Sequence, residues 1–177
     1  MLKHVHLTKR QWFGILKWSV YALLFLLSLV FQSVILTRLP LFGAKLSLIP
    51  LLLVCICIKE GPEAGGLFVL LAALFWSQSG VDMGNISLLT VTVCSVLSAV
   101  LCKTVLANRF LSAAICCFLA TLLNDSLVFV FKLILTQIDP SNYLRVLLPG
   151  AALSMLLFPL AYLLVKAISK IGGDHGV

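Results

Sequence analysis

Charge is scarce in this chain of 177 residues: 11% of the residues are charged, and only six are Asp or Glu. An average soluble domain is about 25% charged and about 45–50% apolar, whereas this chain is 62% hydrophobic and has a mean hydropathy of +1.16. A globular fold of about 150 residues leaves roughly 30% of the unfolded chain's surface exposed, so it could not hide this much apolar surface. The composition predicts an integral membrane protein with no room for a soluble catalytic domain.

Groups that perform acid–base or metal chemistry are also missing from the apolar part of the sequence. The three histidines, His4, His6 and His175, lie near the chain ends, so a serine or cysteine nucleophile would have no His base. Asp125 is the one carboxylic acid deep within an apolar run, so there is no carboxylate pair for aspartyl chemistry. A Gly-rich phosphate loop is absent as well. We therefore expect no enzyme activity, no cofactor and no metal site.

Cysteine is present, but without the spacing that binds metals. All six cysteines fall inside apolar runs, with no CxxC pair and no nearby histidine: Cys55, Cys57, Cys94, Cys102, Cys116 and Cys117. Free cysteine behaves as a small buried hydrophobe. We expect buried thiols, and neither disulfides nor zinc.

Six apolar runs predict an all-α polytopic membrane protein, a bundle of six transmembrane helices. A span needs about 20 residues, and the runs are Trp18–Leu36, Leu39–Ile58, Ala64–Val81, Ile86–Leu106, Phe110–Leu135 and Leu144–Ile168. One domain is expected: a basic cytoplasmic segment at 1–17, the six-span region at 18–168 and a cytoplasmic tail at 169–177.

The second and third runs leave two topologies open. Their uninterrupted apolar cores, Leu46–Ile58 and Ala64–Trp76, have 13 residues each, a length that also suits a re-entrant pair. A re-entrant pair would place the charged KEGPE turn at 59–63 near mid-membrane, at a cost of at least about 2.5–3.5 kcal/mol for each charge. Two spans with this turn in water avoid that cost, and we favour them.

Lysine and arginine are unevenly distributed between the two sides of the predicted bundle. With the N-terminus inside, nine of the 13 basic residues are cytoplasmic, and four are external: Arg38, Lys45, Lys132 and Arg145. Cytoplasmic loops carry an excess of Lys and Arg, so both termini are expected in the cytoplasm. We attribute the net charge of +7 to this bias and expect no nucleic-acid partner.

Polar residues and glycines inside the runs are the candidate interaction or structural residues. Gln32, Asn124, Asp125 and Lys132 are expensive in lipid and should face the bundle or a cavity. They would serve either a ligand site or hydrogen bonds between helices, and we favour hydrogen bonds. The GxxxG spacing at 61–65 allows helices to approach closely. The candidates are Gln32, Pro50, Glu60, Gly61, Gly65, Gly66, Asn124 and Asp125.

The order of these features resembles the MreD family of rod shape-determining proteins. The resemblance is strongest over residues 25–80: Gln32 late in the first span, a Phe42–Gly43 turn, a Pro50-headed second span and EGPEAGG at 60–66. LPGAALSMLLFPLAYLL at 148–164 looks like the family's last span. One departure is Ser77–Gln78, where many members have an Asp.

The resemblance implies a non-catalytic role in bacterial cell elongation, in the cell (inner) membrane among membrane lipids. The implied partners are a single-span MreC-like protein and, through it, the peptidoglycan synthases. The implied six-helix fold is similar to that of transporter S components. The alternative function is therefore a substrate-binding S component of an energy-coupling-factor vitamin transporter. That family docks through an Ala-xxx-Ala pattern in its first helix, but here Ala22 is followed by Leu26.

Overall fold

A computed structural model describes residues 9–36, 48–78, 85–104, 110–136 and 140–170 of the chain, and these residues are helical almost throughout, with no strand among them. The expected all-α class is confirmed. The elements are α1 (Lys9–Phe31), a π-helical turn η1 (Gln32–Leu36), α2 (Leu48–Glu60), α3 (Pro62–Gln78), α4 (Asn85–Thr104), α5 (Phe110–Thr136) and α6 (Pro140–Ser169). Several sequence features lie outside the described residues or side chains: His4, His6, Arg38, Phe42–Gly43, Lys45, Lys132, Arg145 and His175.

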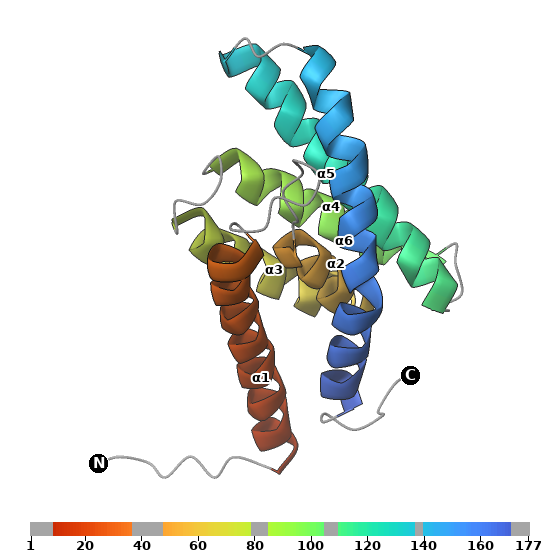
Figure 1. The fold of residues 1–177 in the computed structure, drawn as a ribbon. Helices are drawn as coiled ribbons and strands as arrows, with labels where there is room; N and C mark the ends of the chain where they lie inside the picture. The colour runs from red at the N-terminus through yellow and green to blue at the C-terminus, as the bar shows by residue number, and fades with distance from the viewer. Residues whose placement is uncertain (1–8, 37–47, 79–84, 105–109, 137–139, 171–177) are drawn as a thin grey trace.

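Helix α2 lies at the centre of the bundle and packs against each of the other five α-helices (Figure 1). Each residue from Leu48 to Ile58 is buried, so α2 presents no lipid-facing stripe. A helix that is hydrophobic on all sides is typical of a position surrounded by other helices. The apolar character of α2 therefore reflects burial within the protein.

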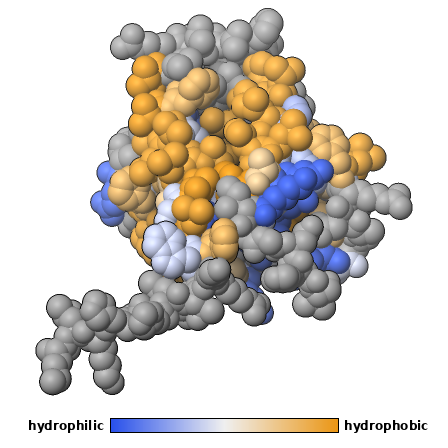
Figure 2. Space-filling view, turned by 90° about the horizontal axis from the view of Figure 1, so that it is seen from below, coloured by the Kyte–Doolittle hydropathy of each residue, from blue (hydrophilic) through white to orange (hydrophobic). Residues whose placement is uncertain are grey.

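The helices alternate in direction, and one end of the bundle gathers the described lysines. The Tyr21 hydroxyl in α1 lies 3.4 Å from the carbonyl oxygen of Val165 near the end of α6. The ring of Phe110, where α5 begins, lies 5.0 Å from the ring of Tyr162 in α6. The α2–α3 turn lies at the same end. We call this the basic end; its described lysines are Lys17, Lys59, Lys103, Lys166 and Lys170. Figure 2, viewed toward this end, shows hydrophilic side chains among a largely apolar surface.

Three of the described helices are long and apolar enough to cross a membrane, where the sequence predicts six spans. These stretches are Trp12–Val34, Ile86–Thr104 and Phe110–Phe131, and Leu153–Ser169 of α6 is a shorter apolar helix. Helices α2 and α3 have 13 and 17 residues, which at 1.5 Å per residue makes them about 20 and 26 Å long. Both are shorter than the hydrocarbon core of about 30 Å. By this measure the described parts of α2 and α3 do not cross the hydrocarbon core as the full-length second and third spans that the sequence predicts, since the left-handed turn at Gly61 separates two short helices.

Candidate functional site at the two ends of helix α2

One face of α1 carries a stripe of buried or half-buried side chains, three of which hold α2. The stripe runs at helical spacing through Lys17, Tyr21, Phe25, Ser28 and Gln32. Residues three or four apart lie on the same face of a helix. Ser28 donates a hydrogen bond locally, to the carbonyl oxygen of Phe25, at 2.7 Å. The polar groups at the two ends of the stripe reach outward to α2.

Gln32 caps the beginning of α2. Its side-chain oxygen Oε1 accepts hydrogen bonds from the backbone N–H groups of Leu48 at 3.1 Å and Ile49 at 3.0 Å. The first N–H groups of a helix have no partner within the helix. The next residue, Pro50, has no N–H to satisfy, which is why proline is tolerated in a first turn. With Gln32 as acceptor and Pro50 as the third residue, none of the first three residues of α2 has an unpaired N–H group, which would be unfavourable inside the bundle.

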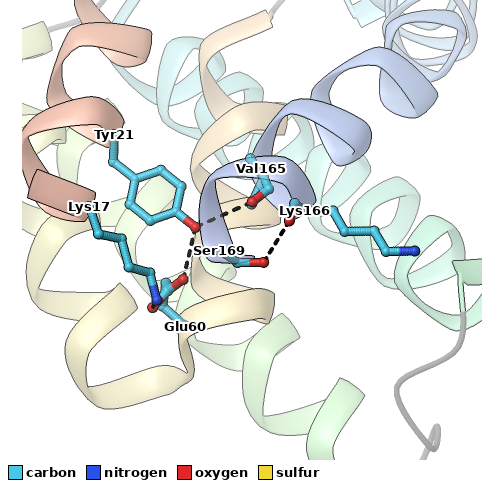
Figure 3. A network of polar contacts seen from close by, with 6 residues as sticks. All are labelled: Lys17, Tyr21, Glu60, Val165, Lys166 and Ser169. Atoms are coloured by element: carbon cyan, nitrogen blue, oxygen red, sulfur yellow. Dashed lines mark hydrogen bonds and ion pairs between the residues drawn. The ribbon is translucent and has the colours of Figure 1, made fainter. Parts of the chain in front are cut away.

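Glu60 closes the other end of α2 and binds α1. Its Oε2 lies 2.6 Å from the Nζ of Lys17, and the Tyr21 hydroxyl donates to its Oε1 at 2.8 Å (Figure 3). The Glu60 side chain is only 10% exposed. We expected the whole 59–63 turn in water, but this carboxylate lies under α1. Its ammonium and hydroxyl partners offset the desolvation of the charge.

The glycines of the turn allow α2 and α3 to pack closely. Gly61 has a φ of 93°, a left-handed conformation that ends a helix, and its N–H donates to the Cys57 carbonyl at 3.0 Å. A Cβ on Gly65 would lie 2.8 Å from the Cα of Cys57, and one on Gly66 would lie 3.0 Å from a methyl carbon of Val96. Two of these glycines therefore make close contacts within the chain, with α2 and with α4.

These contacts form one device, which we call the α2 clamp: Lys17, Tyr21, Gln32, Pro50, Glu60, Gly61, Gly65 and Gly66. Lys17 in α1 and Gln32, the first residue of η1, are 15 residues apart, or about 22 Å along the α1 axis. Helix α2, at about 20 Å, matches that separation. Antiparallel α1 thus binds α2 at both of its ends.

Asn124 and Asp125 form a separate polar site on α5. Asn124 lies 14 residues beyond Phe110, or about 21 Å along α5 from the basic end. Its buried Nδ2 donates to the Oδ1 of half-buried Asp125 at 3.3 Å. Among the described residues, Asn124 Oδ1 and the Oγ of buried Ser95 in α4 are buried without a hydrogen-bond partner. The sequence places Gln32 and this pair in one class; in the structure Gln32 caps α2, and Asn124 donates to its neighbour Asp125.

All six cysteines are free and buried, as expected. The sulfur atoms of Cys55 in α2 and Cys117 in α5 lie 3.6 Å apart, a thiol contact in the core. Within the described part of the chain, no group of three or more His, Cys, Asp or Glu side chains is arranged to hold a metal ion.

Lys17 and Tyr21 were not among the candidate residues predicted from the sequence, nor was the contact of the Lys59 Nζ with the Tyr162 ring, whose centroid is 4.8 Å away. Lys17 and Tyr21 are four residues apart at the start of an apolar run, so the polar face of α1 was visible in the sequence. The sequence did not indicate that Glu60 is their partner, because 39 residues separate it from Tyr21.

No protein-family model matches the chain, and no curated protein or solved structure matches it. The resemblance to the MreD family rests on the residues quoted above.

Proposed function

We propose that this chain is a non-catalytic scaffold or regulator of bacterial cell elongation, of the MreD type, in the cell membrane. In this role it binds a single-span MreC-like protein and, through it, the peptidoglycan synthases. The observation that supports the proposal is where the residues of the resemblance lie. Gln32, Pro50, Glu60, Gly61, Gly65 and Gly66 all belong to the α2 clamp; Pro50 lies in the first turn of α2, and each of the others has a specific contact or conformation.

The clamp suits a scaffold because it fixes the relative positions of helices. It joins α1, α2 and α3 through backbone-directed hydrogen bonds, an ion pair and close helix packing. In a membrane, such contacts hold helices together in the absence of a hydrophobic driving force. A rigid bundle of this kind can present a constant surface to a membrane partner.

In the same proposal the chain passes back and forth six times, with α2 and α3 as short passes and the basic end in the cytoplasm. The support is the excess of lysine at that end. Reporter fusions at Gly61 and Val177 are expected to report the cytoplasm, and fusions at Asp82 and Ser141 the external side. An external signal at Gly61 would refute this orientation.

The functional test is depletion of the protein in the rod-shaped bacterium that encodes it. We expect rounded, widened cells, restored to rods by the wild-type chain. Affinity purification from solubilised membranes is expected to retain a single-span MreC-like protein. Normal rods combined with a vitamin requirement would refute the proposal and favour the transporter S component.

A further inference from the structure

The basic end carries more positive charge than its own acidic groups neutralise. Among the described side chains, five lysines meet two glutamates there. Lys17 and Glu60 neutralise each other at 2.6 Å. Lys103, Lys166 and Lys170 are exposed, Lys59 is half-buried, and the remaining acid, Glu63, is exposed in the first turn of α3. A net positive surface remains around the α2–α3 turn.

Two of these lysines, on different helices, lie at or beside that turn. The Nζ of Lys103, at the end of α4, is 3.6 Å from the position of a Cβ on Gly61. Lys59, two residues before Gly61, places its Nζ 4.8 Å from the centroid of the Tyr162 ring in α6. The Lys103 ammonium thus lies against Gly61 in the turn, and the Lys59 ammonium, two residues before Gly61, lies against α6.

An exposed aromatic side chain lies beside the ring that the Lys59 ammonium contacts, and an exposed leucine adjoins each of the two aromatic residues in sequence. The Tyr162 ring contacts Phe110, which is 50% exposed at the start of α5. Leu111 beside it is 70% exposed, and Leu163 of α6 is 62% exposed. A molecule bound here meets cations at one end and an apolar surface at the other. That pattern fits a phospholipid, whose phosphate and acyl chains can contact both parts, better than an acidic peptide, whose charges would contact the lysines alone.

We propose that Lys59 and Lys103 bind the phosphate headgroup of an anionic phospholipid, whose acyl chains pack on Phe110, Leu111 and Leu163. The site differs from the α2 clamp and does not depend on the cell-elongation role. A basic residue near an anionic membrane surface contributes about 1 kcal/mol of attraction, a factor of about five in affinity.

The test compares spin-labelled phosphatidylglycerol with spin-labelled phosphatidylcholine on the full chain in phosphatidylcholine vesicles. We expect the wild-type protein to immobilise the anionic label preferentially. The double variant Lys59→Gln/Lys103→Gln should reduce the relative association constant by about fivefold or more. The matched control Lys166→Gln/Lys170→Gln removes the same charge at the same end but should reduce it by less than twofold. Lys59→Arg/Lys103→Arg should retain the preference.

Three results would overturn this site. The wild-type chain could show no preference for the anionic label, which would favour an acidic protein partner for the basic end. The control pair could lower the preference as much as the Lys59/Lys103 pair, which would mean diffuse attraction. The Lys59→Gln/Lys103→Gln variant could be folded, with its thiols protected, and bind the anionic label as well as the wild type.

Discussion

Gly65→Ala tests the close approach of α3 to α2. The added Cβ would lie 2.8 Å from the Cα and 3.2 Å from the carbonyl oxygen of Cys57. Overpacking costs typically 1–3 kcal/mol, and we use about 3 kcal/mol because the obstructing atoms belong to backbone and cannot rotate away. Alanine regains about 1 kcal/mol over glycine in a helix. The net destabilisation of about 2 kcal/mol lowers the Tm by about 4–8 °C for a chain of this size.

The buried cysteines supply the assay, because a thiol-reactive fluorescent dye labels them only when the bundle opens. Thermal unfolding in detergent micelles is followed by this dye for three matched variants. Gly14→Ala has nothing within 4 Å of the new Cβ and should keep or raise the Tm. Gly66→Ala meets only a side-chain methyl carbon of Val96, at 3.0 Å, and should fall between the other two. A Gly65→Ala protein as stable as Gly14→Ala would refute the close packing of α2 and α3.

Three further predictions concern the polar residues. Gln32→Ala leaves two buried N–H groups unpaired and should lower the free energy of unfolding by about 2 kcal/mol in the dye assay, whereas exposed Ser33→Ala should change it by less than about 0.5 kcal/mol. Glu60→Gln leaves the Lys17 ammonium without its ion-pair partner and should lower the free energy of unfolding by about 3 kcal/mol. Adding Lys17→Met should restore at least about 1 kcal/mol of that stability. If the two substitutions instead had purely additive effects, the result would contradict the ion pair. Asp125→Asn should preserve membrane abundance and cell shape, while Asp125→Lys should lower the abundance of the protein several-fold. If Asp125→Asn were present at normal abundance but failed to restore cell shape, the carboxylate would have a functional role.

The long helices could be predicted from the sequence within a few residues. The runs Ile86–Leu106 and Phe110–Leu135 became α4 (Asn85–Thr104) and α5 (Phe110–Thr136), because a long apolar run bounded by polar residues has few alternatives to a membrane helix. Helix α1 begins at Lys9, within the segment expected at 1–17, because lysine and arginine are good helix formers that hydropathy excludes.

The clamp could be predicted only in part. The sequence singled out Gln32, Pro50, Glu60 and the glycines, since polar or flexible residues in apolar surroundings need a reason. It could not pair them. The geometry with which α1 crosses α2 decides which N–H groups donate to Gln32 and which ammonium group pairs with Glu60. The types of the side chains do not encode that geometry.

The polar contacts matter most for α1, because this helix has the least packing to hold it. Of the residues in its spanning stretch, 17% are buried, against 44% in that of α4. In lipid an exposed leucine gains little by moving from acyl chains onto another helix, so apolar contacts alone attach α1 weakly. Its attachment therefore depends on Gln32 at one end of α2 and on Lys17 and Tyr21 at the other. The two attachments are about as far apart as α2 is long, so a shift of α1 by one turn, about 5.4 Å, would break both together. Such a device fixes the register of α1, and it leaves the apolar outer face of α1 in a constant position for lipid or for a partner helix.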